Sequence, residues 1–250
     1  KLILEETDST HWLNKLEVLV RKSNLNEDID LSLIDEKSFS EDARIRSSFY
    51  RLYAGFYNRA GDIVKADSFI EKAIHLNPDR FTNYEVKLSF MTERVLPYID
   101  SNENYKTDIN IFLEEIESVK KKYSELGGIR SRSKASILIM ELNAYRIQEE
   151  RIKVEQIVKN IFELIFDCYF DKHTERILVS VLWGVYLPQE EFERLLHYLN
   201  QTKIQMSDEL SQTLIIQFNF HNKLFDEGKK FFTDRNDLKY ISFIENIENK

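Results

Sequence analysis

The sequence contains very little cysteine, proline and glycine: one, three and six residues respectively among 250. The lone Cys168 excludes a disulfide framework and a multi-cysteine zinc site within one chain, and it favours a reducing compartment, the cytoplasm. So few turn-forming residues argue against an all-β sandwich, a collagen-like repeat and a glycine-rich phosphate loop. No run of 18 or more apolar residues occurs, so no transmembrane helix and no membrane partner are predicted.

The charge balance is acidic, with 35 Lys+Arg, 43 Asp+Glu and a formal net charge of −8. A general binder of duplex DNA needs a basic face, so nucleic acid is disfavoured as a partner. Two basic clusters lie within a dozen residues of each other, at 120–122 and at Arg130, Arg132 and Lys134. Cations are favourable near a helix C-terminus, and we prefer that interpretation to a phosphate site.

Hydrophobic periodicity predicts helices along almost the whole chain. Apolar residues recur at steps of three and four, as in Phe112, Ile116 and Val119, and no strand alternation persists. Ser38 followed by Glu41 fits a capping box, and Ser207 followed by acids fits a helix start. The expected helices are 9–22, 41–60, 63–76, 79–95, 107–126, 132–148, 151–170, 173–186, 189–200, 207–221, 224–233 and 236–247.

Residues 47–80 carry a more specific pattern. Counted from Ser47, small residues fall at positions 8, 20 and 27, and large aromatic residues fall at positions 4 and 11. These residues are Ala54, Ala66 and Ala73, and Tyr50 and Tyr57. Gly61 lies where two helices would turn, and Pro78 closes the unit because proline cannot continue a helix. The segment resembles a tetratricopeptide repeat, a helix–turn–helix unit of 34 residues.

This resemblance implies an all-α fold, a right-handed α-solenoid of antiparallel helical pairs. One repeat cannot bury its apolar face alone, so the other helices are expected to stack as divergent pairs. A compact helical bundle is the alternative, because Pro97 breaks the repeat pattern downstream. We expect an N-terminal helix and acidic loop at 1–40, tetratricopeptide-like hairpins at 41–100, and a divergent helical-repeat region at 101–250 that continues from them.

Catalytic and metal-binding patterns are missing from the sequence. The five histidines never lie three or four residues apart, so no helix presents a paired metal site. There is no Walker A, GxGxxG, GxSxG or HExxH motif. Cys168 lies in an apolar stretch, where we expect a buried and inert thiol. We therefore predict no enzyme activity, no catalytic or metal residues and no cofactor.

The resemblance also implies a concave groove, lined by the first helix of each repeat, that holds a peptide or partner helix. Arg51, Asn58 and Arg59 suit a carboxylate or backbone carbonyls through charge-assisted hydrogen bonds. Gly55 stands where chaperone-tail-binding members of the family have asparagine, which argues against that ligand. The groove residues carried over from the family are Ser48, Arg51, Gly55, Asn58, Arg59, Thr82, Glu85, Ser89 and Thr92.

The leading hypothesis for function is a non-enzymatic scaffold that binds a protein or peptide. The chain starts at Lys1 without methionine, and we expect it to be a fragment of a larger protein. One alternative is a sensor or oligomerisation segment of a multidomain bacterial signalling or defence NTPase or of a peptide-responsive regulator, in which case the chain forms a homo-oligomer. An RNA-binding helical repeat and an enzyme with a site assembled from distant helices complete the alternatives.

Overall fold

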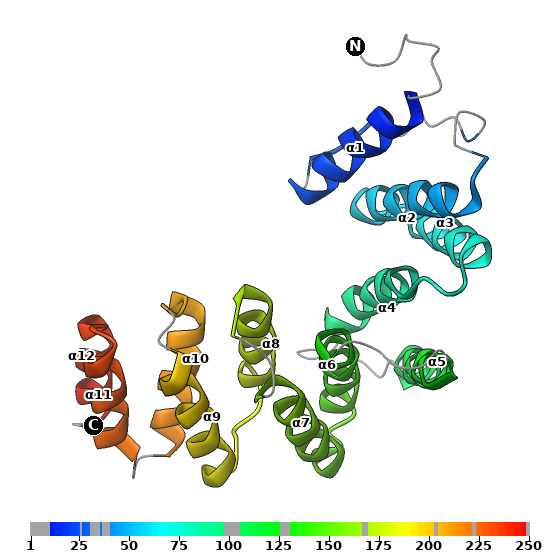
Figure 1. Ribbon diagram of the computed structural model, residues 1–250. Coiled ribbons are helices and arrows are strands. Elements are labelled where there is room, and N and C mark those ends of the chain that lie inside the picture. Colours follow the sequence, from blue (N-terminus) through cyan, green and yellow to red (C-terminus); the bar gives the residue numbers. More distant parts are fainter. Residues whose placement is uncertain are drawn as a thin grey trace. The chain divides into compact units, whose positions relative to one another are not determined.

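The computed structural model describes residues 11–25, 27–30, 36, 41–97, 106–125, 131–166, 170–202, 205–221 and 224–248. Within these ranges the chain forms twelve α-helices and no strand, which confirms the predicted all-α class (Figure 1). No helix in the described part is both long and apolar enough to cross a membrane. The predicted inert thiol, Cys168, lies outside the described residues.

The chain divides into two compact units. The first comprises Lys1–Pro97 and Glu114–Leu126, and the second comprises Tyr98–Leu113 and Gly127–Lys250. Helix α5 (Lys106–Glu125) contributes to both units. The first unit also has α1 (His11–Asn24), α2 (Ala43–Arg59), α3 (Ile63–Leu76) and α4 (Phe81–Val95). The other helices of the second unit are α6 (Ser131–Ile147), α7 (Arg151–Phe166), α8 (Lys172–Leu182), α9 (Gln189–Thr202), α10 (Asp208–Phe220), α11 (Phe225–Asp234) and α12 (Leu238–Glu248).

Every expected helix is present. The capping residues at the helix starts agree with the sequence analysis only in part. The carboxylate of Asp42 accepts hydrogen bonds from the backbone N–H groups of Arg44 and Ile45, so α2 is capped by Asp42. The predicted capping residue Ser38 lies outside the described residues. Ser207 does cap α10, because its hydroxyl accepts from the N–H of Leu210 at 3.2 Å.

Helices α2 and α3 form the predicted antiparallel pair. Gly61 in the turn has a φ of +78°, a left-handed conformation that glycine adopts without strain. Ala54, Ala66 and Ala73 are each 0% exposed, so the two backbones approach closely where these small side chains meet. On α3, the ring of Phe69 packs among three tyrosine rings of α2 at centroid distances of 5.2–6.3 Å: those of Tyr50, Tyr53 and Tyr57.

A buried polar cluster attaches α4 to this pair. The backbone carbonyl of Ala73 accepts hydrogen bonds from the hydroxyl of Ser47 (2.8 Å) and from the amide of Asn83 (3.0 Å). The same amide donates to the Ser47 hydroxyl at 3.0 Å. Ser47 and Asn83 are fully buried, and the Asn83 amide nitrogen and the Ser47 hydroxyl find their partners inside the protein, whereas the Asn83 Oδ1 has none among the described residues. One residue from each of three helices therefore sets the position of α4.

In the second unit, packing follows alternate helices. Helix α6 pairs with α7, and α6, α8, α10 and α12 pack in succession as one row (Figure 1). Helix α9 packs on α7, and α11 packs on α10 and α12. A Cβ on Gly228 of α11 would lie 3.0 Å from side-chain atoms of Phe218 and Ile244, so α11 approaches its neighbours closely there. The row leaves one face of α8 and α10 exposed.

Candidate functional site

The predicted groove residues lie on α2 and α4, two adjacent helices that run in the same direction. Ser47 contacts Asn83 at 3.0 Å, and further along both helices the Asn58 amide donates to the Glu93 carboxylate at 2.6 Å. These contacts join residues 36 and 35 positions apart in the sequence. Equivalent faces of α2 and α4 therefore lie side by side, and the candidate residues of both helices share one surface.

Arg51 is the most unusual residue of this surface. Its guanidinium is largely buried, and within the described part of the chain its Nε has no hydrogen-bond partner. Burial is the main cause that lowers the pKa of Arg51, to about 10; the positive charge of Arg80 acts in the same direction, and the carboxylate of Glu85 opposes both. The side chain is still charged at neutral pH. A buried cation with an unused donor is costly unless an acceptor reaches it, so this position is suited to binding an oxygen ligand.

Two of the predicted groove residues are already engaged by the chain itself. The Ser48 hydroxyl donates to the backbone carbonyl of Arg44 and accepts from the guanidinium of Arg80 at 2.8 Å. The amide of Asn58 is held by Glu93, as described above. Ser48 and Asn58 are therefore part of the packing between α2 and α4, and a ligand reaching them would compete with these contacts.

The other predicted residues keep more exposure. Arg59 is exposed, lies 4.7 Å from the ring centre of Phe56, and donates to the backbone carbonyl of Glu27 at 3.4 Å. Thr82 and Glu85 are half-buried on α4. Ser89 and Thr92 are also half-buried, and each hydroxyl donates to a carbonyl of its own helix, Ser89 to that of Val86 at 2.9 Å. A Cβ on Gly55 would meet only Arg59, at 4.0 Å.

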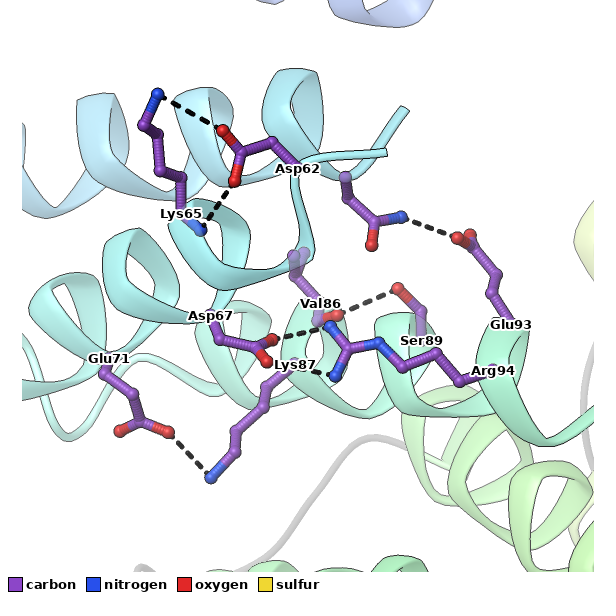
Figure 2. A network of polar contacts seen from close by, with 10 residues as sticks. Asp62, Lys65, Asp67, Glu71, Val86, Lys87, Ser89, Glu93 and Arg94 are labelled. Atoms are coloured by element: carbon purple, nitrogen blue, oxygen red, sulfur yellow. Dashed lines mark hydrogen bonds and ion pairs between the residues drawn. The ribbon is translucent and has the colours of Figure 1, made fainter. Parts of the chain in front are cut away.

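Ion pairs support α4 from the side of α3 (Figure 2). The guanidinium of Arg94 makes two contacts with the carboxylate of Asp67, at 2.6 and 3.0 Å. Lys87 lies 2.8 Å from the carboxylates of both Glu71 and Glu115. Burial disfavours the charged form of Lys87, but the two carboxylates outweigh burial and raise its pKa. These contacts link α4 to α3 and, through Glu115, to α5.

Sequence reasoning missed three residues of this surface: Arg80, Asn83 and Glu93. Arg80 and Asn83 lie at the start of α4, and their contacts with α2 span 32 and 36 residues. Counting roughly one repeat length forward from Ser47, Ser48 and Asn58 would have found all three. The signal was present, but a single repeat match does not reveal which polar residues pair across helices.

The other predicted features do not assemble into a site in the described residues. Lys120 pairs with Glu117, Lys122 lies 5.1 Å from the ring centre of Tyr84, and Lys121 points to solvent. Arg130 lies outside the described residues, as does the side chain of Arg132. Among the described residues, no group of three His, Cys, Asp or Glu side chains is arranged to hold a metal ion.

Surface hollows occur in the second unit, along α9 and α11. One hollow of about 850 Å³ is lined by Lys230 and Arg235 together with Asp234 and Asp237, and amides complete its wall. The Arg235 guanidinium donates to the backbone carbonyl of Leu199 and lies over the ring of Phe231. With both signs of charge and a structural role for its arginine, this hollow indicates no particular ligand.

No protein-family model matches this chain, and comparisons with curated proteins and with solved structures gave no significant match.

Proposed function

We propose that the chain is a non-enzymatic scaffold that binds a protein or peptide, and that its helices stack as a right-handed α-solenoid of tetratricopeptide-like pairs. The spacing of contacts supports this stacking. Gln217 of α10 contacts the backbone of Val185 in the segment after α8, 32 residues away, and Tyr240 of α12 contacts Asp208 of α10, also 32 residues away. With the spacings of 35 and 36 between α2 and α4, these values bracket the 34-residue repeat.

The observation that carries the proposed binding site is Arg51. A carboxylate or a peptide carbonyl bound between α2 and α4 would pair with the guanidinium of Arg51, whose buried Nε has no hydrogen-bond partner among the described residues. The half-buried Thr82 and Ser89 and the exposed Arg59 flank this position and offer further polar contacts to an extended peptide. The lone cysteine supports a cytoplasmic location for this scaffold.

The test starts from peptides selected by phage display against the complete chain. Binding of the selected peptides is measured by fluorescence anisotropy with the unaltered protein and with Arg51→Gln and Arg51→Glu variants. We expect Arg51→Gln to weaken binding about tenfold, because it removes a charge-assisted hydrogen bond, and Arg51→Glu to weaken it further. Arg51→Lys keeps the charge without the planar fork and should give an intermediate affinity.

The matched control is Lys121→Glu, which makes the same charge reversal at an exposed position of α5. It should leave affinity unchanged, and circular dichroism should show equal helix content in all variants. Selected peptides that bind every Arg51 variant as tightly as the unaltered protein would disprove the assignment to this groove. Peptides that lose affinity only on charge reversal at α5 would point to a different surface.

A further inference from the structure

A rigid support holds the segment between α8 and α9 against α10. The buried Gln217 amide donates to the backbone carbonyl of Val185 at 2.8 Å and accepts from the N–H of Leu187 at 3.0 Å. The Nε2 of His221 lies 2.7 Å from the Leu187 carbonyl. Both residues that flank Tyr186 are thereby fixed through their backbones, and the Tyr186 side chain is directed away from the core.

Large apolar side chains gather on this support. Tyr186 is 60% exposed and stacks on Phe220, which is 55% exposed, with ring centres 4.4 Å apart and planes at 16°. Trp183 follows α8 directly, in line with the exposed residues of that helix, and is 70% exposed; Ile216 lies one turn before Phe220 and is 41% exposed. We name Trp183, Tyr186, Ile216 and Phe220 the α8–α10 aromatic patch. Exposed aromatic residues that are held rigidly are typical of binding surfaces.

The same stripe of α8 is basic at its other end. Lys172, His173 and Arg176 are exposed, and in the described part of the chain Arg176 forms no ion pair. The carboxylate of Glu175 accepts a hydrogen bond from the backbone N–H of Ser207 at 2.5 Å and is therefore engaged elsewhere. Trp183 lies seven positions after Arg176 in the sequence, which corresponds to about 10 Å along a helix. An extended peptide covers that distance in about three residues.

We propose that the α8–α10 aromatic patch binds an extended segment of a partner protein in which an acidic residue lies about three positions from a pair of apolar residues. The apolar side chains pack on Trp183 and on the stacked pair of Tyr186 and Phe220. The acidic side chain pairs with Arg176. This site belongs to the second unit and does not rest on the groove between α2 and α4.

The area and the charge of the patch select this occupant. Its four side chains expose roughly 450 Å² together, an area that a short peptide segment with two apolar side chains can cover. The basic end of the α8 stripe is complementary to a carboxylate.

The probe is a fluorescein-labelled nonapeptide with a glutamate three positions before two leucines and with serine and glycine elsewhere. Its binding to the complete chain is followed by anisotropy, and independently by the fluorescence of Trp183 in a Trp12→Phe background, where Trp183 is the sole tryptophan. We expect saturable binding with a shift in Trp183 emission. Trp183→Ala, Phe220→Ser and Arg176→Glu should each weaken binding about tenfold.

Matched controls lie on α7 of the same unit: Ile152→Ser replaces an apolar residue that is 80% exposed, and Lys159→Glu reverses an exposed charge. Both should bind the probe normally. A peptide with lysine in place of glutamate should bind poorly to the unaltered protein and regain affinity for Arg176→Glu. Absence of saturable binding, or binding that is insensitive to all three patch variants, would overturn the proposal.

Evidence for either of two other occupants would also overturn the proposal, and the same variants test for both. A dimer in analytical ultracentrifugation that Trp183→Ala converts to monomer would assign the patch to a second copy of the chain. Stronger binding of labelled oligouridine than of the peptide, lost in Arg176→Glu, would assign it to RNA. Because Arg51 variants leave this unit unaltered, loss of probe binding on Arg51→Gln would also contradict a separate second site.

Discussion

At the scale of single residues, the Ala73 carbonyl is the centre of a buried hydrogen-bond cluster in the first unit. It accepts from Ser47 and from Asn83, and Asn83 also donates to the carbonyl of Asn77 at 3.3 Å. The desolvation free energy of a buried polar group is no longer offset when the group loses a hydrogen bond. Substitutions in this cluster should therefore destabilise the chain more than substitutions in a surface ion pair.

Asn83→Ala should lower the free energy of unfolding of the chain by about 1–3 kcal/mol, because it removes the hydrogen bonds that the buried amide donates to the Ser47 hydroxyl and to the carbonyls of Ala73 and Asn77. Urea denaturation followed by circular dichroism measures the change. Lys65→Ala, which removes an exposed ion pair with Asp62, is the control and should cost about 0.5 kcal/mol or less. Equal effects of the two substitutions would show that the buried cluster contributes no more than the surface pair.

Gly61 offers a residue-scale test of backbone strain alone. A Cβ at this position would meet no atom within 4 Å, so any cost of a side chain comes from its φ of +78°. Gly61→Ala should destabilise the chain by about 1–2 kcal/mol, and Gly61→Asn by less, since asparagine tolerates the left-handed region. The midpoint of thermal unfolding measures both. If the alanine variant were as stable as the asparagine variant, strain at this turn would not limit stability.

At the scale of elements, one carboxylate supplies a polar link between α10 and α12, beside the apolar core that the two helices share. Asp208 accepts hydrogen bonds from Lys239 at 2.6 Å and from the Tyr240 hydroxyl at 2.8 Å. Hydrogen bonding from Lys239, and then from Tyr240, lowers the pKa of Asp208 below its ordinary value of 3.8. A lowered carboxylate pKa stabilises the folded state above the ordinary pKa, and this stabilisation is lost as the pH falls through the lowered value.

Asp208→Asn should therefore lower Tm slightly at pH 7, and the difference from the unaltered protein should shrink as the pH falls below about 4. Differential scanning calorimetry from pH 7 to pH 3 gives the comparison. Because both partners are exposed, 1 M NaCl should reduce the difference at pH 7. A difference that stays constant across the whole pH range would mean that the charge of Asp208 has no part in the link.

The residue at which a helix ends can depend on contacts with another helix. The apolar stripe of α8 continues toward Tyr186, and the pattern predicted a helix to residue 186. The helix ends at Leu182 because Gln217 of α10 takes the backbone groups of Val185 and Leu187 that further helix would have used. By contrast, both predicted ends of α3, at 63 and 76, are confirmed. Asp62 supplies a local start signal, and the residues before Pro78 supply a local stop signal.

At the scale of the whole molecule, a destabilising substitution in one compact unit should increase local unfolding in that unit alone. Most contacts of each unit are internal, so local opening in one unit need not expose the other. We expect Asn83→Ala to accelerate hydrogen exchange in α2, α3 and α4 and to leave α8, α10 and α12 protected. Mass spectrometry of peptides from both units measures this. Uniform loss of protection along the chain would instead indicate one cooperative unit.

The sequence by itself determined the helical class, the positions of the twelve helices and the α2–α3 pair, because periodicity, Gly61 and the three alanines act within or next to one helix. It also placed Arg51 on the candidate surface. Only the tertiary structure decided that Ser48 and Asn58 are engaged by Arg80 and Glu93, that no described residue pairs with the Arg51 Nε, and that Tyr186 and Phe220 form a supported patch. Those facts depend on contacts between residues 32 or more positions apart, and no local pattern specifies which polar groups such packing brings together.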